Sequence, residues 1–158
     1  DKNALESLKE AYMVYQKKYD LPDFTLLNEI FDIEEASVET EFLLRRIRRL
    51  MVDKLTGYVR FIEMILNPTN APLFFLKLVK KLDTKDREIL GKMYDLLGNL
   101  ETEVVSLDID YTEKKEALFI SKVHTLFRED IQKNILLINE KLTKEATPER
   151  KSNGSYFG

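Results

Sequence analysis

The chain has 158 residues, of which 44% are hydrophobic and 34% charged, and its formal net charge is −3. It has no cysteine, which excludes disulfides, thiolate nucleophiles and cysteine-ligated metals, and its 5 glycines and 4 prolines are too few for the tight turns of an all-β fold. The length suits one domain, no apolar run approaches the roughly 18 residues that cross a bilayer, and the first residues do not resemble a signal peptide, so we expect a cytoplasmic protein without a membrane span.

The first 44 residues are acidic, with eleven Asp/Glu against four Lys/Arg. Apolar residues spaced three and four apart predict a helix over residues 3–19, and Pro22 breaks this pattern. A short helix over residues 24–31 is predicted next, and the acidic residues 32–38 are expected to form a connector. The apolar positions of the first helix are Leu5, Leu8, Tyr12, Tyr15 and Tyr19.

A long predicted helix follows this connector. Ser37 is expected to cap its N-terminus, with Glu39 and Glu41 in the first turn. Pro68 disfavours a helical conformation in the residue before it, so the helix is expected to end at Asn67. At 1.5 Å per residue the helix would be roughly 40 Å long, enough to form the spine of the domain. Its apolar stripe consists of Leu44, Ile47, Met51, Leu55, Tyr58, Ile62 and Ile65.

Residues 67–72, which contain two prolines, predict a loop. Asn70 is expected to cap a helix over about residues 71–82. The apolar residues of this helix, among them Phe74 and Phe75, are predicted on one broad side and its lysines on the other. Three interpretations stay open: the apolar side fills the core, it forms a groove for a partner, or it lies at a membrane surface.

Two further helices are predicted in the remaining chain. Helical spacing predicts one from residue 84 to about residue 105, followed by an acidic connector over residues 106–111. Thr112 is expected to cap the last long helix, which continues to about residue 143 with a kink at residues 128–130.

These elements predict an all-α fold, a single-domain antiparallel bundle of five or six helices over residues 1–143. Residues 144–158 contain Pro148, Gly154 and Gly158 among polar residues and are predicted to form a flexible C-terminal tail.

Residues 45–92 are strongly basic, with twelve Lys/Arg against five Asp/Glu. On a helical wheel most of these arginines lie away from the apolar stripe, and the lysines of the next helix form a second basic face. Arg48 instead lies at the edge of the stripe, so it is expected to bury its stem and pair with an internal carboxylate. If the two faces coincide in space they can neutralise phosphates; alternatively, the acidic residues 1–44 cover them. The candidate phosphate or anion contacts are Arg45, Arg46, Arg49, Arg60, Lys77, Lys80 and Lys81.

No pattern in the chain predicts catalysis or a cofactor. A di-iron bundle needs two Glu-x-x-His motifs, whereas this chain has one histidine, His124, with a serine three residues before it. Asp108 and Asp110 are oxygen ligands of the type that divalent cations use, but two carboxylates are too few, and a turn is their expected role. Phosphate-binding glycine loops and nucleophile elbows are also missing, so we expect a non-enzymatic protein without a metal, a cofactor or a small-molecule substrate.

Two segments carry a resemblance to known proteins. Asn67-Pro68-Thr69-Asn70-Ala71-Pro72 between two helices, and Leu107-Asp108-Ile109-Asp110-Tyr111 before the last helix, resemble a group of small uncharacterised archaeal helical proteins. The likeness runs from about Leu21 to Leu126 and includes Arg45–Arg49. It implies an intracellular all-helical domain, and it assigns no functional residue because the group has no established activity.

These patterns favour a non-enzymatic helical interaction or scaffold domain that binds a protein partner, or a second copy of itself, through its charge polarity and a helix groove. The alternative is a nucleic-acid- or ribosome-associated factor that contacts phosphates through its basic helix face. The two hypotheses differ in what abolishes binding, because only phosphate contacts depend steeply on salt and disappear with nuclease treatment.

Overall fold

The computed structural model describes residues 3–36 and 41–144. These residues are helical apart from short connections, and they contain no strand. The all-α prediction is therefore confirmed. The predicted tail over residues 144–158 lies outside the described residues except for Lys144.

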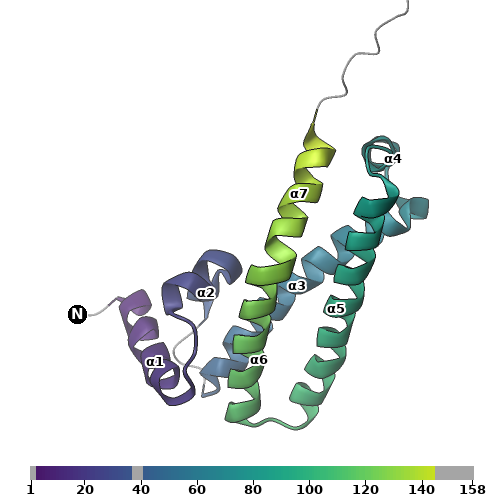
Figure 1. Ribbon diagram of the computed structural model, residues 1–158. Coiled ribbons are helices and arrows are strands. Elements are labelled where there is room, and N and C mark those ends of the chain that lie inside the picture. Colours follow the sequence, from purple (N-terminus) through teal and green to yellow (C-terminus); the bar gives the residue numbers. More distant parts are fainter. Residues whose placement is uncertain (1–2, 37–40, 145–158) are drawn as a thin grey trace, which may run out of the picture.

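A helical hairpin and one long crossing helix form the frame of the molecule (Figure 1). Helix α5 (Thr84–Ile109) runs antiparallel to α6 (Glu113–Leu126) and α7 (Gln132–Thr143), which continue one another as a single rod. Helix α3 (Leu43–Leu66) crosses the hairpin obliquely and contacts both α5 and α6. The prediction that this helix is the spine of the domain is therefore confirmed.

The N-terminal helices pack beside the first half of α3 (Figure 1). Helix α1 (Ala4–Tyr19) begins where the Asn3 side chain accepts a hydrogen bond from the Glu6 amide at 2.8 Å. Helix α2 (Phe24–Phe31) has the predicted bounds, and a short 3₁₀ turn, η1 (Ile33–Glu35), follows it. Two aspartates with positive φ, Asp20 and Asp32, end α1 and α2 in the left-handed conformation that short polar residues tolerate.

The start of α3 differs from the prediction. The expected cap, Ser37, lies outside the described residues, and Glu41 and Phe42 are not helical, so the helix begins at Leu43. Phe42 packs edge-on against Tyr111, with ring centroids 4.9 Å apart. This tertiary contact fixes the residue that enters the helix, and local capping patterns do not reveal it. The predicted end is confirmed, because α3 stops at Leu66 with Asn67 as its C-cap.

Helix α4 (Leu73–Val79) is shorter than predicted, and Asn70 is not its cap. Residues Pro68–Asn70 form a 3₁₀ turn, η2, and Ala71 is extended with φ −77° and ψ 149°. The reason is Pro72, whose ring disfavours a helical conformation in the residue before it. The helix can therefore begin no earlier than Pro72, which is its N-cap residue.

Helix α5 starts as predicted and extends further. Asp83 and Asp86 form a reciprocal capping box at its start. At its end the helix continues to Ile109, so most of the predicted acidic connector is helical. Leu107 is 4% exposed and Asp108 binds arginines of α3, and these contacts hold the last turn in place.

The kink expected at residues 128–130 is a π-helical segment, η3 (Phe127–Ile131), between α6 and α7. Each step of four residues overshoots one turn at 100° per residue by about 40°, so three such steps would carry an apolar stripe roughly 120° around a regular helix. The π turn absorbs one residue and returns the stripe to the core. The side chains spaced in this way are Val123, Phe127, Ile131 and Ile135.

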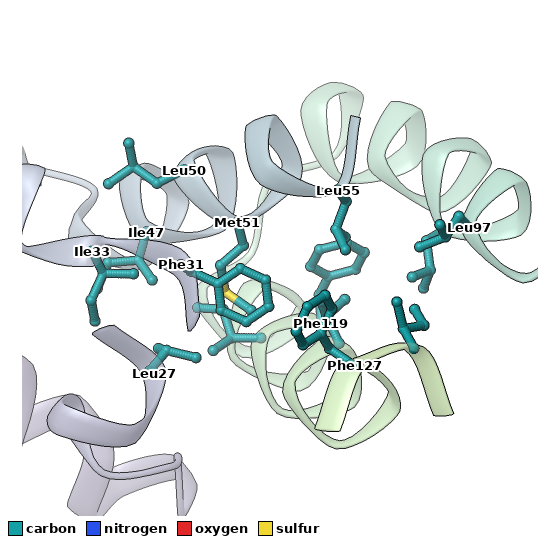
Figure 2. Close-up of a cluster of buried hydrophobic side chains, with 14 of the residues drawn as sticks. Leu27, Phe31, Ile33, Ile47, Leu50, Met51, Leu55, Leu97, Phe119 and Phe127 are labelled. Atoms are coloured by element: carbon teal, nitrogen blue, oxygen red, sulfur yellow. The ribbon is translucent and has the colours of Figure 1, made fainter. Parts of the chain in front are cut away.

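The core lies where α2, α3, α5 and α6 meet (Figure 2). The ring of Phe127, in the π segment, packs against rings from two helices. Its centroid lies 5.4 Å from that of Phe31 on α2 and 5.3 Å from that of Tyr58 on α3. Phe119 is 1% exposed in the same cluster. The core is therefore built around the crossing of α3 over the hairpin, which also positions the polar cluster described next.

Candidate functional site

Arg48 is a fully buried charge at the crossing of α3 and α6. Its side chain is 1% exposed, and Glu116 in the first turn of α6 is 0% exposed. The Nε atom of Arg48 donates to one carboxylate oxygen of Glu116 at 2.8 Å, and Nη2 donates to the other at 3.0 Å. Nη2 also donates to Asp108 at the end of α5, at 2.8 Å. The predicted pairing of Arg48 with internal carboxylates is confirmed, and it links three helices.

The electrostatics of this cluster favour its charged state. Burial opposes the charge on Arg48, but the hydrogen bonds that Arg48 donates to Glu116 and Asp108 outweigh burial and raise the pKa of the guanidinium above its ordinary value. The hydrogen bond from Arg48 likewise holds the pKa of the Asp108 carboxyl below its usual range. The Arg48 guanidinium and the Asp108 carboxylate therefore remain charged through the physiological range of pH.

Two more arginines of the predicted basic face surround Asp108. Arg45 donates from Nη2 to the backbone carbonyl of Asp108 at 3.2 Å, and its guanidinium lies 5.4 Å from the centre of the Tyr111 ring. Arg49 lies 3.8 Å from the Asp108 carboxylate. The carboxylates that face these arginines come from α5 and α6, so the acidic residues 1–44 are not their counterpart in the described part of the chain.

The remaining predicted phosphate contacts do not gather at one place. Arg46 and Arg60 are exposed on α3, about 21 Å apart along a helix of 1.5 Å per residue. Lys77 and Lys80 are exposed on α4, beyond the C-terminal end of α3. Lys81 is engaged elsewhere, because its Nζ donates to the carbonyls of Leu142 and Lys144 at the end of α7, at 3.2 and 2.6 Å. The arginines of α3 are therefore spread along the helix, and among them only Arg60 lies toward the end that α4 follows.

The residues considered for metal or acid–base chemistry have other roles. Asp108 binds arginines, and Asp110 pairs with Lys115. Another carboxylate, that of Glu63 on α3, accepts a hydrogen bond from the Tyr94 hydroxyl at 2.9 Å. In residues 3–36 and 41–144 no three His, Asp or Glu side chains are grouped so that they could hold a metal ion. These carboxylates therefore serve helix contacts.

His124 is 6% exposed on the buried side of α6. Burial, with a smaller contribution from the positive charge of Arg128, lowers the pKa of His124 below its ordinary value. An unfolded histidine binds a proton at about pH 6.5, so as the pH falls below that value the unfolded state takes up the proton first. Burying the neutral histidine therefore costs no unfolding free energy above about pH 6.5. Below that value the free energy of unfolding decreases, until the pH reaches the lower pKa of the folded state.

We expect the His124→Gln variant to lose less unfolding free energy than the parent between pH 7 and pH 5, because glutamine does not titrate. The difference amounts to about 1.4 kcal/mol for each unit by which the histidine pKa is depressed. Urea denaturation at both pH values measures it, and carboxyl groups that titrate in the same range cancel in the comparison. Identical pH dependence of the two proteins would contradict the assignment.

A groove runs between α3 and α7. A hollow of about 360 Å³ is lined by Lys54, Gly57, Tyr58, Phe61, Ile135 and Asn139, and we call it the α3–α7 groove. A second hollow, of about 180 Å³, shares Lys54, Tyr58 and Ile135 with it and extends toward Ile30 of α2 and the 60%-exposed Leu136 of α7. Figure 1 shows α7 diverging from α3 as the two helices leave the core.

Helix α4 exposes apolar side chains on its basic face. Leu73 and Phe74 are each 72% exposed, whereas Val79 is 4% exposed. The prediction that all apolar residues of this helix lie on one broad side is therefore wrong for Phe74. Its side chain lies on the outer face, together with Lys77 three residues later, whereas Val79 faces the core. A seven-residue helix at the edge of the molecule buries only a narrow stripe, and the wheel alone does not indicate how narrow.

The sequence reasoning missed the roles of Glu116 and Asp86. Glu116 lies four residues before the buried Ile120, so it falls on the apolar stripe of α6, and a carboxylate in that position signals a buried partner. Asp86 is 2% exposed and pairs with Lys141 of α7. The sequence around Asp86 indicates a position in the first turn of a helix, but it does not indicate the ion pair with Lys141, which lies 55 residues further along the chain.

Among the described residues, no helix combines the length and the apolar character needed to traverse a membrane. No protein-family model, no curated protein and no solved structure matches the chain, so the resemblance to archaeal helical proteins stays a prediction.

Proposed function

We propose that this chain is a non-enzymatic, cytoplasmic interaction domain that receives an amphipathic helix of a partner protein in the α3–α7 groove. The observation that supports this proposal is the groove itself, which presents apolar surface from two helices. Tyr58 and Phe61 contribute from α3, and Ile135 contributes from α7. All three side chains are half-buried, so part of each remains in contact with solvent.

The shape of the groove favours a helix as its occupant. Lining residues recur at helical spacing on both walls, at positions 54, 57, 58 and 61 of α3 and at positions 135 and 139 of α7. A third helix packs into such a channel with apolar side chains at positions i, i+3, i+4 and i+7. Gly57 lies on one wall, and the lack of a side chain there lets another backbone approach closely.

The charged side chains at the rim, Lys54 and Glu29, are of opposite sign, so the rim does not select a strongly charged partner helix. Lys54 lies 3.8 Å from Asp32, so its charge is already matched within the chain. Gln132 and Asn139 are neutral. Because this rim has no strong excess of either sign, the apolar contacts carry the recognition and charge only adjusts it.

The test is to fill the groove without disturbing the fold. A Cβ atom built on Gly57 or on Gly91 meets no atom within 4 Å, so both glycines accept a side chain. Gly57→Leu places its side chain in the groove, and Gly91→Leu on α5 is the matched control. We expect proteins captured by the parent from a nuclease-treated extract to be retained by Gly91→Leu and lost by Gly57→Leu. Equal capture by both variants would exclude this groove as the binding site.

The alternative function, phosphate binding, is supported by Arg46, Arg60, Lys77 and Lys80, which are exposed and make no ion pair with other described residues. Replacing Arg46 and Arg60 by glutamine is expected to weaken RNA binding and to reduce its salt dependence if this hypothesis holds. Gel-shift titrations at two salt concentrations measure both quantities. Lack of RNA binding by the parent at low salt excludes the alternative.

A further inference from the structure

We propose that the outer face of α4 binds the surface of a lipid bilayer that contains anionic headgroups. The face consists of Leu73, Phe74, Lys77 and Lys80, and we call it the α4 face. These residues repeat at steps of three and four, so they form one stripe along a single side of the helix. The inference is independent of the α3–α7 groove, because no residue belongs to both.

The apolar part of the α4 face is unusually open for a helical domain. Leu73 and Phe74 are each 72% exposed. Figure 1 places α4 at an extremity of the molecule. Apolar groups that project from a convex end can enter the hydrocarbon edge of a bilayer without a pre-formed pocket.

The charges beside these apolar groups suit anionic headgroups. Residues 66–82 contain three lysines and no Asp or Glu. Two of these lysines, Lys77 and Lys80, are exposed and pair with no carboxylate in the described part of the chain. Their long stems can lie along the apolar surface while the ammonium groups reach lipid phosphates.

The distribution of charge over the whole molecule supports the same orientation. The net charge of −3 would by itself oppose binding to an anionic surface. The acidic first part of the chain, however, includes α1 and α2, and Figure 1 shows these helices on the side of the molecule away from α4. The protein therefore approaches such a surface with α4 leading and its acidic helices directed away.

A groove on another protein is a weaker candidate for what binds the α4 face. A helix that docks in a groove uses anchors over two turns or more, whereas α4 exposes its two apolar residues only at its first turn and lysines after them. This order, an apolar tip followed by cations, fits the vertical layering of a bilayer, in which phosphates lie outside the hydrocarbon.

The experiment is co-sedimentation of the full chain with vesicles of phosphatidylcholine alone and of phosphatidylcholine mixed with phosphatidylglycerol. We expect binding to the mixed vesicles only. Phe74→Ser is expected to reduce binding by roughly tenfold or more, because it removes a large apolar side chain from the bilayer edge. Lys77→Gln combined with Lys80→Gln is expected to reduce it by roughly fivefold for each lysine.

Matched controls replace residues of the same type far from α4. Leu118→Ser on α6 removes a side chain that is 62% exposed, and Lys17→Gln combined with Lys114→Gln removes two exposed lysines. Both are expected to bind the mixed vesicles like the parent. Lack of binding by the parent, equal binding to both vesicle types, or unchanged binding of Phe74→Ser would each overturn the proposal. Capture of soluble polyglutamate in a Phe74-dependent manner without vesicle binding would also overturn it, in favour of an acidic protein partner.

Discussion

Glu116→Ala is expected to lower the free energy of unfolding by about 3–5 kcal/mol, because it leaves the buried guanidinium of Arg48 without its bidentate partner. The alanine also leaves space that the surrounding core does not fill. Urea denaturation followed by far-ultraviolet circular dichroism measures the change. Asp108→Asn serves as the comparison, since the Asp108 side chain is 45% exposed, and we expect a loss of only about 1 kcal/mol.

The double variant Arg48→Met and Glu116→Leu separates the cost of an unpaired charge from the cost of an altered core. Replacing both partners of a buried ion pair by apolar side chains of similar size is often neutral or stabilising. We therefore expect the double variant to be more stable than Glu116→Ala by several kcal/mol. If the two proteins unfold at the same urea concentration, the unpaired charge is not the source of the loss.

Deleting single residues from two exposed helical positions is expected to give opposite results. Removing Glu129 from the π segment shortens the step from Phe127 to Ile131 from four residues to three, and the apolar stripe then alternates threes and fours along a regular helix. The π turn becomes unnecessary and the core contacts of α7 are kept. We expect this variant to fold with unchanged or higher stability.

Removing Thr102 from α5 has no such compensation. The deletion rotates the rest of the helix by about 100°, which takes Leu107 out of the core and Asp108 away from Arg48. We expect a loss of about 3 kcal/mol or more, from the burial of one leucine and the weakening of the arginine cluster. Thermal unfolding of the two deletion variants beside the parent measures the contrast. Equal destabilisation by both deletions would show that the π segment does not absorb an extra residue.

Much of the helical architecture could be predicted from the sequence, because its signals are local. Pro68 ended α3, Thr112 capped α6, and steps of three and four residues identified the buried stripes. The three consecutive four-residue spacings that end at Ile135 also indicate the π segment, although only a kink was predicted there. These features depend on neighbours along the chain, which a sequence displays directly.

Two of the wrongly predicted helix boundaries depend on contacts between distant residues, whereas the late start of α4 follows from its neighbour Pro72. Helix α3 begins late because Phe42 packs on Tyr111, and α5 extends because Asp108 meets Arg48. The burial of Arg48 could be predicted from its position on the wheel, whereas the identity of its partner required the crossing of α3 and α6. The outward direction of Phe74 likewise follows from where α4 lies in the fold, which no helical period determines.

Apart from its contacts with the neighbouring α2, helix α1 is attached to the molecule through residues that are far away along the chain. Tyr19 and Lys18 both donate to Glu113, at sequence separations of 94 and 95 residues, and α1 buries only Leu8 and Tyr12 fully. Closing so long a loop costs conformational entropy. The small apolar surface that α1 buries offsets little of this cost until α6 is already in place. We therefore expect the chain to assemble from its centre outward. The residues that a ribosome would make first among those described here are then the last to reach their native positions.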